Sequence, residues 1–276
     1  MKISIATPCL NCVDTIEKTI KSVIREKQSN DIEYIIIDGE STDGTLRIIE
    51  KYTDYIDIFV SEKDNGIYDA FNKCVKNASG DYVLILAADD YLLKGSIRSF
   101  TESVKPTTEV WSGSVVIFYE GYYQYIFSGK DLSMLRYCCS LRHPATFFKR
   151  GVFEKYGYYN PEYKISGDRE LFIRLYEQNA EFQVEDIPIV FFSMDGISNT
   201  KLLEQAIPEE KRISIEHGVS EEQYQEFQKN SIKKRIKQRM KSITIKTHTY
   251  HLFCKAARKK DKFVNDQDRI RLGFIL

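Results

Sequence analysis

The sequence lacks an apolar segment long enough to span a membrane, and it lacks a cysteine pattern typical of secreted proteins. The apolar stretch at the amino terminus meets Pro8 too early to act as a secretory signal. The six cysteines are scattered, with neither a disulfide framework nor a paired metal-binding spacing, which fits a reducing compartment. These absences predict a cytoplasmic protein.

The chain also lacks net charge, since Lys plus Arg equals Asp plus Glu at 40 each. No overall field therefore attracts nucleic acid, and none is expected as a partner. Neither a G-x-G-x-x-G segment nor a P-loop lysine motif occurs, which argues against a dinucleotide oxidoreductase and a P-loop NTPase.

The balanced total charge hides one asymmetry: between Lys229 and Lys262 the only acid is Asp261. This basic, helix-like stretch fits an anionic membrane surface, or packing on its own domain or on a partner subunit.

A chain of 276 residues with 42% hydrophobic content can bury the core of one large α/β domain with an appendage. Short β-rich runs alternate with amphipathic stretches in the first hundred residues. The runs expected to be strands are Lys2 to Ala6, Glu33 to Ile37, Ile56 to Ser61 and Tyr82 to Ala87. This alternation predicts a mostly parallel sheet wound with helices, in which ligands bind beyond the carboxyl ends of the strands.

Acidic residues stand at two of these strand ends. The most apolar run of the chain, Tyr82 to Ala88, leads directly into Asp89 and Asp90. Asp38 follows the second strand and is expected to hang over the cleft. Paired carboxylates at a sheet edge suit a divalent cation, because hard oxygen ligands bind Mg2+ or Mn2+.

The pattern changes at about Glu109 to aromatic-rich strands, Val110 to Tyr119 and Tyr122 to Phe127, which a Glu120-Gly121 turn joins into a predicted hairpin. After about Thr200 the strands stop and the sequence becomes helical and basic. Ile232, Ile236, Met240 and Ile243 recur there at helical spacing.

Four segments carry a resemblance to a known family, and they occur in its order. They are Thr7-Pro8-Cys9-Leu10-Asn11, Asp38-Gly39-Glu40-Ser41-Thr42-Asp43-Gly44-Thr45, Asp64-Asn65-Gly66 before Ala70-Phe71-Asn72, and Ala87-Ala88-Asp89-Asp90. Together they resemble family 2 glycosyltransferases of the bacterial surface-polysaccharide type, and each lies on the expected element. The resemblance implies a GT-A fold, Rossmann-like, with a mostly parallel central sheet and helices on both faces. It divides the chain into a nucleotide-sugar-binding half (1–108), an acceptor-binding half (109–200) and a helical basic C-terminal region (201–276).

The resemblance also implies a donor site. The residues expected to bind the nucleotide-sugar are Thr7, Pro8, Asp38, Lys63 and Asp89, and Asp89 and Asp90 are expected to hold Mn2+ or Mg2+ at the diphosphate. Ala87 stands where the family often has an acid or amide, so the metal contact is expected mainly from Asp90. Lys63 has a plainer alternative as a solvated loop lysine.

In the second half, two further segments resemble the same family, Arg142 to Phe148 and Ile165 to Leu175. Asp168 matches the family's general base, which takes the acceptor's hydroxyl proton as the anomeric carbon inverts. A plain helix N-cap is the alternative role for this residue. His143 is expected to contact the acceptor or the diphosphate, or to serve as a structural hydrogen-bonding residue.

The resulting hypothesis is an inverting glycosyltransferase in polysaccharide or lipid-linked glycan assembly. It uses a nucleoside-diphosphate-sugar donor, expected to be a UDP-sugar, and a saccharide or lipid-linked saccharide acceptor. A peripheral position at the inner face of the cell membrane and a homo-oligomer are further expectations.

A sugar nucleotidyltransferase is the enzymatic alternative, and a protein that binds membrane or nucleic acid through the basic tail is the non-enzymatic one. The Cys9-Leu10-Asn11-Cys12 segment also permits a thioredoxin-like redox site, which would leave the strand-end acids unexplained.

Overall fold

A computed structural model of the chain describes residues 1–119, 122–193 and 203–230. The strands are β1 (Ile3–Cys9), β2 (Ile32–Asp38), β3 (Ile58–Ser61), β4 (Tyr82–Ile85), β5 (Tyr91–Leu92), β6 (Val110–Tyr119), β7 (Tyr122–Ile126), β8 (Thr146–Lys149) and β9 (Phe182–Phe191). The helices are α1 (Ile16–Lys27), α2 (Thr45–Glu50), α3 (Ile67–Asn77), α4 (Ser96–Ser103), α5 (Gly151–Tyr156), α6 (Gly167–Glu177) and α8 (Leu203–Glu216). Short 3-10 helices are η1 (Thr53–Tyr55), η2 (Leu132–Arg136) and η3 (His143–Ala145).

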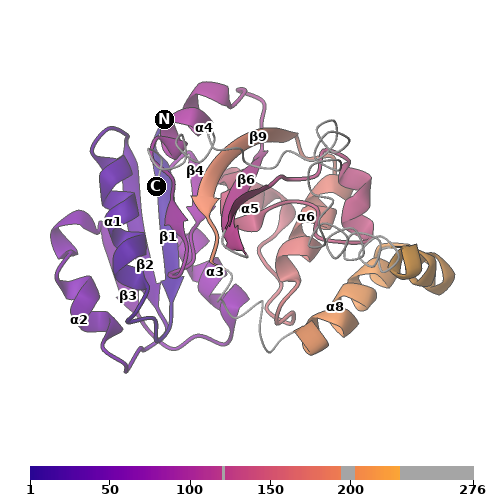
Figure 1. Cartoon of the computed structure of the whole chain (residues 1–276), viewed down its shortest axis with the longest axis horizontal. Coiled ribbons are helices and arrows are strands. Elements are labelled where there is room, and N and C mark those ends of the chain that lie inside the picture. Colours follow the sequence, from indigo (N-terminus) through magenta and orange to yellow (C-terminus); the bar gives the residue numbers. More distant parts are fainter. Residues whose placement is uncertain (120–121, 194–202, 231–276) are drawn as a thin grey trace, which may run out of the picture.

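The strands form one nine-stranded sheet in the order β3-β2-β1-β4-β8-β6-β9-β5, with β7 paired to β6 (Figure 1). β3, β2, β1 and β4 are mutually parallel. β8 runs antiparallel to both β4 and β6, so β6 again points the same way as β4, and β9 is parallel to β6. The carboxyl ends of β1 to β4, β6 and β9 therefore lie along one edge. The predicted α/β fold with a mostly parallel sheet is confirmed.

Helices cover both faces of the sheet, and β2 shows why most residues of such a strand are apolar. Tyr34 and Ile36 belong to the core cluster that includes α1, α2 and α4. Ile35 and Ile37 point the other way, into the cluster that includes α3, α5 and α6. Successive side chains of a strand alternate between faces, so a strand covered on both sides is mostly apolar. The two polar residues of β2, Glu33 and Asp38, are buried with hydrogen-bond partners. The continuous apolar runs of the sequence are these doubly covered strands.

The predicted strands match the observed ones, with differences at their ends. The third begins at Ile58 instead of Ile56, and the fourth ends at Ile85 because the chain soon turns, with the Asp90 amide donating to the Ala87 carbonyl at 3.1 Å. The predicted hairpin is present as the β6–β7 pair. Its turn residues, Glu120 and Gly121, lie outside the described residues.

The described part of the C-terminal region is helical and packs on the domain. In α8, Ile213 is buried in the core cluster of α3, α5 and α6. Figure 1 shows α8 at the end of the molecule opposite α1 and α2. Among the described residues, no helix is both long enough and apolar enough to cross a membrane. The basic stretch and the apolar stripe from Ile232 to Ile243 lie outside the described residues.

Candidate functional site

Asp38 joins the loops that follow the first three strands. Its Oδ2 accepts from the Ser41 amide at 3.0 Å and from the Ser61 hydroxyl at 2.7 Å, and its Oδ1 lies 3.6 Å from the Cys9 thiol. The residue is fully buried. It therefore does not overhang the cleft as expected, because three nearby donors satisfy its carboxylate inside the sheet edge. Its contact with a nucleotide stays a prediction.

The loop after β2 is held by polar contacts with the loop after β1. The Ser41 hydroxyl accepts from the Asn11 amide at 2.8 Å, and the Asn11 side chain accepts from the Thr42 amide at 2.9 Å. Asp43 accepts from the amide of Thr45, the first residue of α2, at 2.9 Å. This contact satisfies one of the free amides at a helix start. These bonds hold the loops after β1 and β2 together.

The other residues predicted to bind the donor differ in exposure. The Thr7 side chain is fully buried and lies 3.4 Å from the Tyr34 hydroxyl, whereas Pro8 is partly exposed. Lys63 is exposed, and its carbonyl accepts from the Lys73 ammonium at 2.7 Å. Pro8 and Lys63 are therefore accessible to a ligand, and Thr7 is an interior residue of β1.

Lys73 organises the loop after β3, a role that the sequence analysis missed. Its ammonium lies 2.7 Å from Asp64, 3.1 Å from Glu62 and 3.6 Å from Asp69. The Asp69 carboxylate also accepts from the Asn65 amide at 2.9 Å, at the start of α3. The spacing of Asp69 and Lys73, four residues apart on one helix, was the available signal.

Asp89 and Asp90 are unequal partners at the end of β4. Asp90 is 1% exposed, and its Oδ1 accepts from the Ser193 amide, just beyond β9, at 2.8 Å. Its Oδ2 is buried and has no hydrogen-bond partner. Burial, and after it the charge of Asp89, raises the pKa of Asp90 well above its usual range. Asp89 is partly exposed, so it is the more accessible carboxylate of the pair.

Asp168 is the second residue of α6, after the cap position at Ser166. It is therefore not the N-cap residue itself. Its Oδ1 accepts from the Arg169 amide at 2.8 Å and lies 3.4 Å from the Tyr68 hydroxyl, and its Oδ2 lies 3.8 Å from the Cys139 thiol. Burial raises the pKa of this carboxyl group. The residue as a whole is partly exposed.

Tyr68 connects Asp168 with the donor half. It lies in the first turn of α3, which follows the carboxyl end of β3. Further along α3, both side-chain groups of Asn72 bond to the backbone of Tyr159, at 2.8 and 3.0 Å. Asn72 thus connects α3 with the loop before α6. The start of α3 brings Asp168 to the same sheet edge as Asp38 and the Asp89–Asp90 pair.

His143 lies in an aromatic cluster beside this edge. Its ring stacks on Phe71 at 5.2 Å between ring centres, and its Nε2 is 2.8 Å from the Tyr159 hydroxyl. The residue is only 8% exposed. Burial lowers the pKa of His143 to about 4, so the ring is neutral near pH 7. These contacts favour the structural role over contact with the acceptor, which stays a prediction.

His143 should make folding stability depend on pH. Its pKa is about 4 when folded and the usual 6.5 when unfolded, so the unfolded chain binds more protons between these values. Protonation of His143 leaves the free energy of unfolding unchanged above pH 6.5. As the pH drops towards 4, it lowers that free energy by about 3 kcal/mol in all. Urea unfolding of the wild type and His143→Gln at several pH values measures this. The wild type should lose more stability than the variant on acidification, and a difference independent of pH would contradict the prediction.

Comparison with known proteins places the chain in a family. The model of "Glycosyl transferase family 2" matches residues 4–161. The PGL/p-HBAD biosynthesis glycosyltransferase of Mycobacterium bovis (strain BCG / Pasteur 1173P2) is 30% identical over 208 residues, which cover 71% of this chain and 79% of that protein. The family match covers most of the predicted donor half and continues into the predicted acceptor half, ending before Asp168.

Two solved structures have a similar fold. S. aureus TarS 1-349, in complex with UDP-GlcNAc, superposes with a TM-score of 0.63 at 18% identity, over 79% of this chain and 66% of that one. The mannosyltransferase PcManGT from Pyrobaculum calidifontis, in complex with GDP-Man and Mn2+, gives 0.51 at 17% identity, over 68% and 55%. The chain therefore belongs to glycosyl transferase family 2 and has the GT-A fold.

Proposed function

We propose that this glycosyltransferase moves a sugar from a UDP-sugar to an acceptor hydroxyl with inversion, and that Asp168 is the general base. One observation carries the proposal: Asp168, a partly exposed residue whose carboxyl group has a raised pKa, lies at the sheet edge that also bears the Asp89–Asp90 pair. A base works best when its pKa is close to the working pH, and burial moves an aspartate in that direction. The UDP-GlcNAc bound to TarS supports the choice of nucleotide.

The chemistry requires one proton acceptor and one stabilised leaving group. The acceptor oxygen forms a bond to the anomeric carbon as its proton passes to the Asp168 carboxylate. The bond from that carbon to the diphosphate breaks on the opposite face, and the nucleoside diphosphate departs with the electron pair. Donation from the Arg169 amide to Asp168 Oδ1 fixes the carboxylate, leaving Oδ2 as the oxygen with the weaker contact, to a thiol.

The acids after β4 fit a divalent cation, Mn2+ or Mg2+. Asp90 has a buried carboxylate oxygen without a partner, and Asp89 beside it is accessible. In the described part of the chain no cluster of three or more metal-ligating side chains occurs, so diphosphate oxygens would complete the coordination. Asp89 and Asp90 would hold the ion, which when bound neutralises charge on the departing diphosphate. The Mn2+ in PcManGT supports this assignment.

The acceptor that we propose is a saccharide or a lipid-linked saccharide in glycan assembly. The name of the mycobacterial relative, a PGL/p-HBAD biosynthesis glycosyltransferase, supports a part in glycoconjugate synthesis. The basic sequence between Lys229 and Lys262 supports work at the cytoplasmic face of an anionic membrane.

A donor screen tests the proposal. The full-length protein is incubated with UDP- and GDP-sugars, and release of the nucleoside diphosphate is measured with Mn2+, with Mg2+ and with a chelator. We expect release from a UDP-sugar that depends on metal and rises when a saccharide acceptor is added. Proton NMR of the product should show the anomeric configuration inverted. Metal-independent release, or a product that retains the donor's configuration, would contradict the respective part of the proposal.

A further inference from the structure

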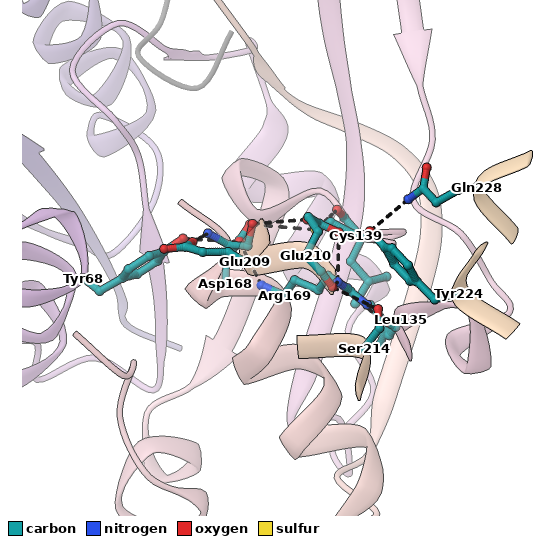
Figure 2. A network of polar contacts seen from close by, with 12 residues as sticks. Tyr68, Leu135, Cys139, Asp168, Arg169, Glu209, Glu210, Ser214, Tyr224 and Gln228 are labelled. Carbon is teal, nitrogen blue, oxygen red and sulfur yellow. Dashed lines mark hydrogen bonds and ion pairs between the residues drawn. The ribbon is translucent and has the colours of Figure 1, made fainter. Parts of the chain in front are cut away.

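Two consecutive acids on α8, Glu209 and Glu210, contact the segment around Asp168 (Figure 2). Glu209 accepts hydrogen bonds from three successive backbone amides just before α6. Its Oε1 is 2.7 Å from the Lys164 amide, and its Oε2 is 2.9 Å from the Ile165 amide and 3.0 Å from that of Ser166. A charged acceptor makes stronger hydrogen bonds than a neutral one, so this carboxylate fixes the path of the loop before Asp168.

Glu210 contacts the residue on the other side of Asp168. Its Oε2 is 2.9 Å from Nη1 of Arg169, and its carbonyl accepts from the same nitrogen at 2.8 Å. The Arg169 side chain is fully buried and also donates to the Leu135 carbonyl and the Ser214 hydroxyl, both at 2.8 Å. A buried guanidinium with all these partners has one preferred placement. The chain is thus fixed by α8 both before and after Asp168.

The donor half contacts the same loop from another direction. The Tyr68 hydroxyl donates to the Ile165 carbonyl at 2.6 Å. At Gly167 a Cβ atom would lie 2.8 Å from the Tyr68 ring, so only glycine allows this close approach. The loop therefore lies between α3 of the donor half and α8, and a shift of either helix would move the Asp168 carboxylate.

We propose that Glu209 is a positioning residue, which holds Asp168 at the place where it meets the acceptor hydroxyl. This inference rests on the proposed role of Asp168 as general base. It assigns α8, which lies beyond the matched family segment 4–161, to the working unit of the enzyme. Without the carboxylate, three amides lose their common acceptor and the loop loses its fixed path. A misplacement of about 1 Å at a reacting group lowers rates by up to about 100-fold.

The test compares Glu209→Ala and Glu209→Gln with Glu216→Gln in the full-length protein. Glu216 is also on α8, but its carboxylate accepts from a side chain, the Tyr163 hydroxyl at 2.6 Å, and from none of the three amides. We expect Glu209→Ala to lower kcat about 10- to 100-fold with donor affinity unchanged. Glu209→Gln, which keeps one good acceptor oxygen, should recover part of that loss, and Glu216→Gln should behave as the wild type.

The pH profile separates positioning from general loss of structure. Groups that surround the Asp168 carboxyl are Tyr68 of α3, Cys139, Arg169 of α6 and Glu210 of α8. In Glu209→Ala the loosened loop exposes Asp168 to water, so the acidic limb of kcat should move to lower pH. A normal kcat with an unmoved acidic limb would overturn the proposal. So would a loss of kcat that is accompanied by a loss of donor affinity and by a lower thermal midpoint. Full turnover in Asp168→Asn would instead refute the proposed base, whatever Glu209 does.

Discussion

Asp168→Asn is expected to lower turnover by about 10²- to 10⁴-fold, the usual contribution of a general base. The amide has nearly the shape of the carboxylate and can still accept from the Arg169 amide, which lies 2.8 Å from Oδ1. It cannot take a proton from the acceptor. Donor affinity should therefore stay close to that of the wild type, while kcat falls. Steady-state transfer assays and calorimetric titration with the nucleoside diphosphate measure the two quantities separately.

A matched control and a pH profile make this prediction specific. Asp186 on β9 forms an exposed ion pair with Lys130 at 3.2 Å, and Asp186→Asn should leave turnover unchanged. Because burial raises the pKa of Asp168, the wild-type rate should fall on acidification at a higher pH than an ordinary aspartate would give. This limb should be missing from the residual rate of Asp168→Asn. Wild-type turnover in that variant would remove Asp168 as the base and leave the donor site untouched.

The sheet and its functional edge could be predicted because their signals are local. The four predicted strands are rich in apolar residues, and they are parallel neighbours in the observed order β3-β2-β1-β4. Parallel strands place their carboxyl ends together, so Asp38 and the Asp89–Asp90 pair had to share an edge. Only the ends of the strands were displaced, by one to three residues.

The exposure of each acid could not be predicted, because it depends on contacts between distant segments. Asp38 is buried, and its carboxylate accepts from the hydroxyl of Ser61, which lies 23 residues further along the chain. Asp90 is buried beside Ser193, which is 103 residues away. His143 is enclosed by Phe71 and Tyr159, from a helix of the donor half and from a loop. A sequence motif identifies such residues without saying which way each side chain points.

The role of α8 was missed for the same reason. Glu209 lies 43 to 45 residues after the amides that it contacts, and nothing in its neighbourhood distinguishes it from an exposed helix acid. The basic residues that follow it indicated a membrane or a partner subunit, and those remain predictions. The described contacts connect α8 to the chain around Asp168.

Asp89→Asn is expected to lower turnover by about 10²- to 10³-fold, the usual cost of losing one group that stabilises developing charge. Asp89 is the accessible acid of the pair, so its charge can reach a cation at the diphosphate. The variant should also need more Mn2+ to reach half of its maximal rate. Transfer rates over a series of Mn2+ concentrations measure both effects, and Asp186→Asn again provides the control.

Asp90→Asn should have a smaller effect than Asp89→Asn, which reverses the ranking that the sequence suggested. An asparagine oxygen can still accept from the Ser193 amide, which lies 2.8 Å from Oδ1 of Asp90, so the contact between the residue before β5 and the chain just beyond β9 survives. Asp90→Ala removes that contact and should also lower the thermal midpoint, because a buried amide loses its partner. If Asp90→Asn instead costs more turnover and more Mn2+ affinity than Asp89→Asn, the buried oxygen without a partner is the main metal ligand. The comparison of the two asparagine variants therefore decides which carboxylate the diphosphate site depends on.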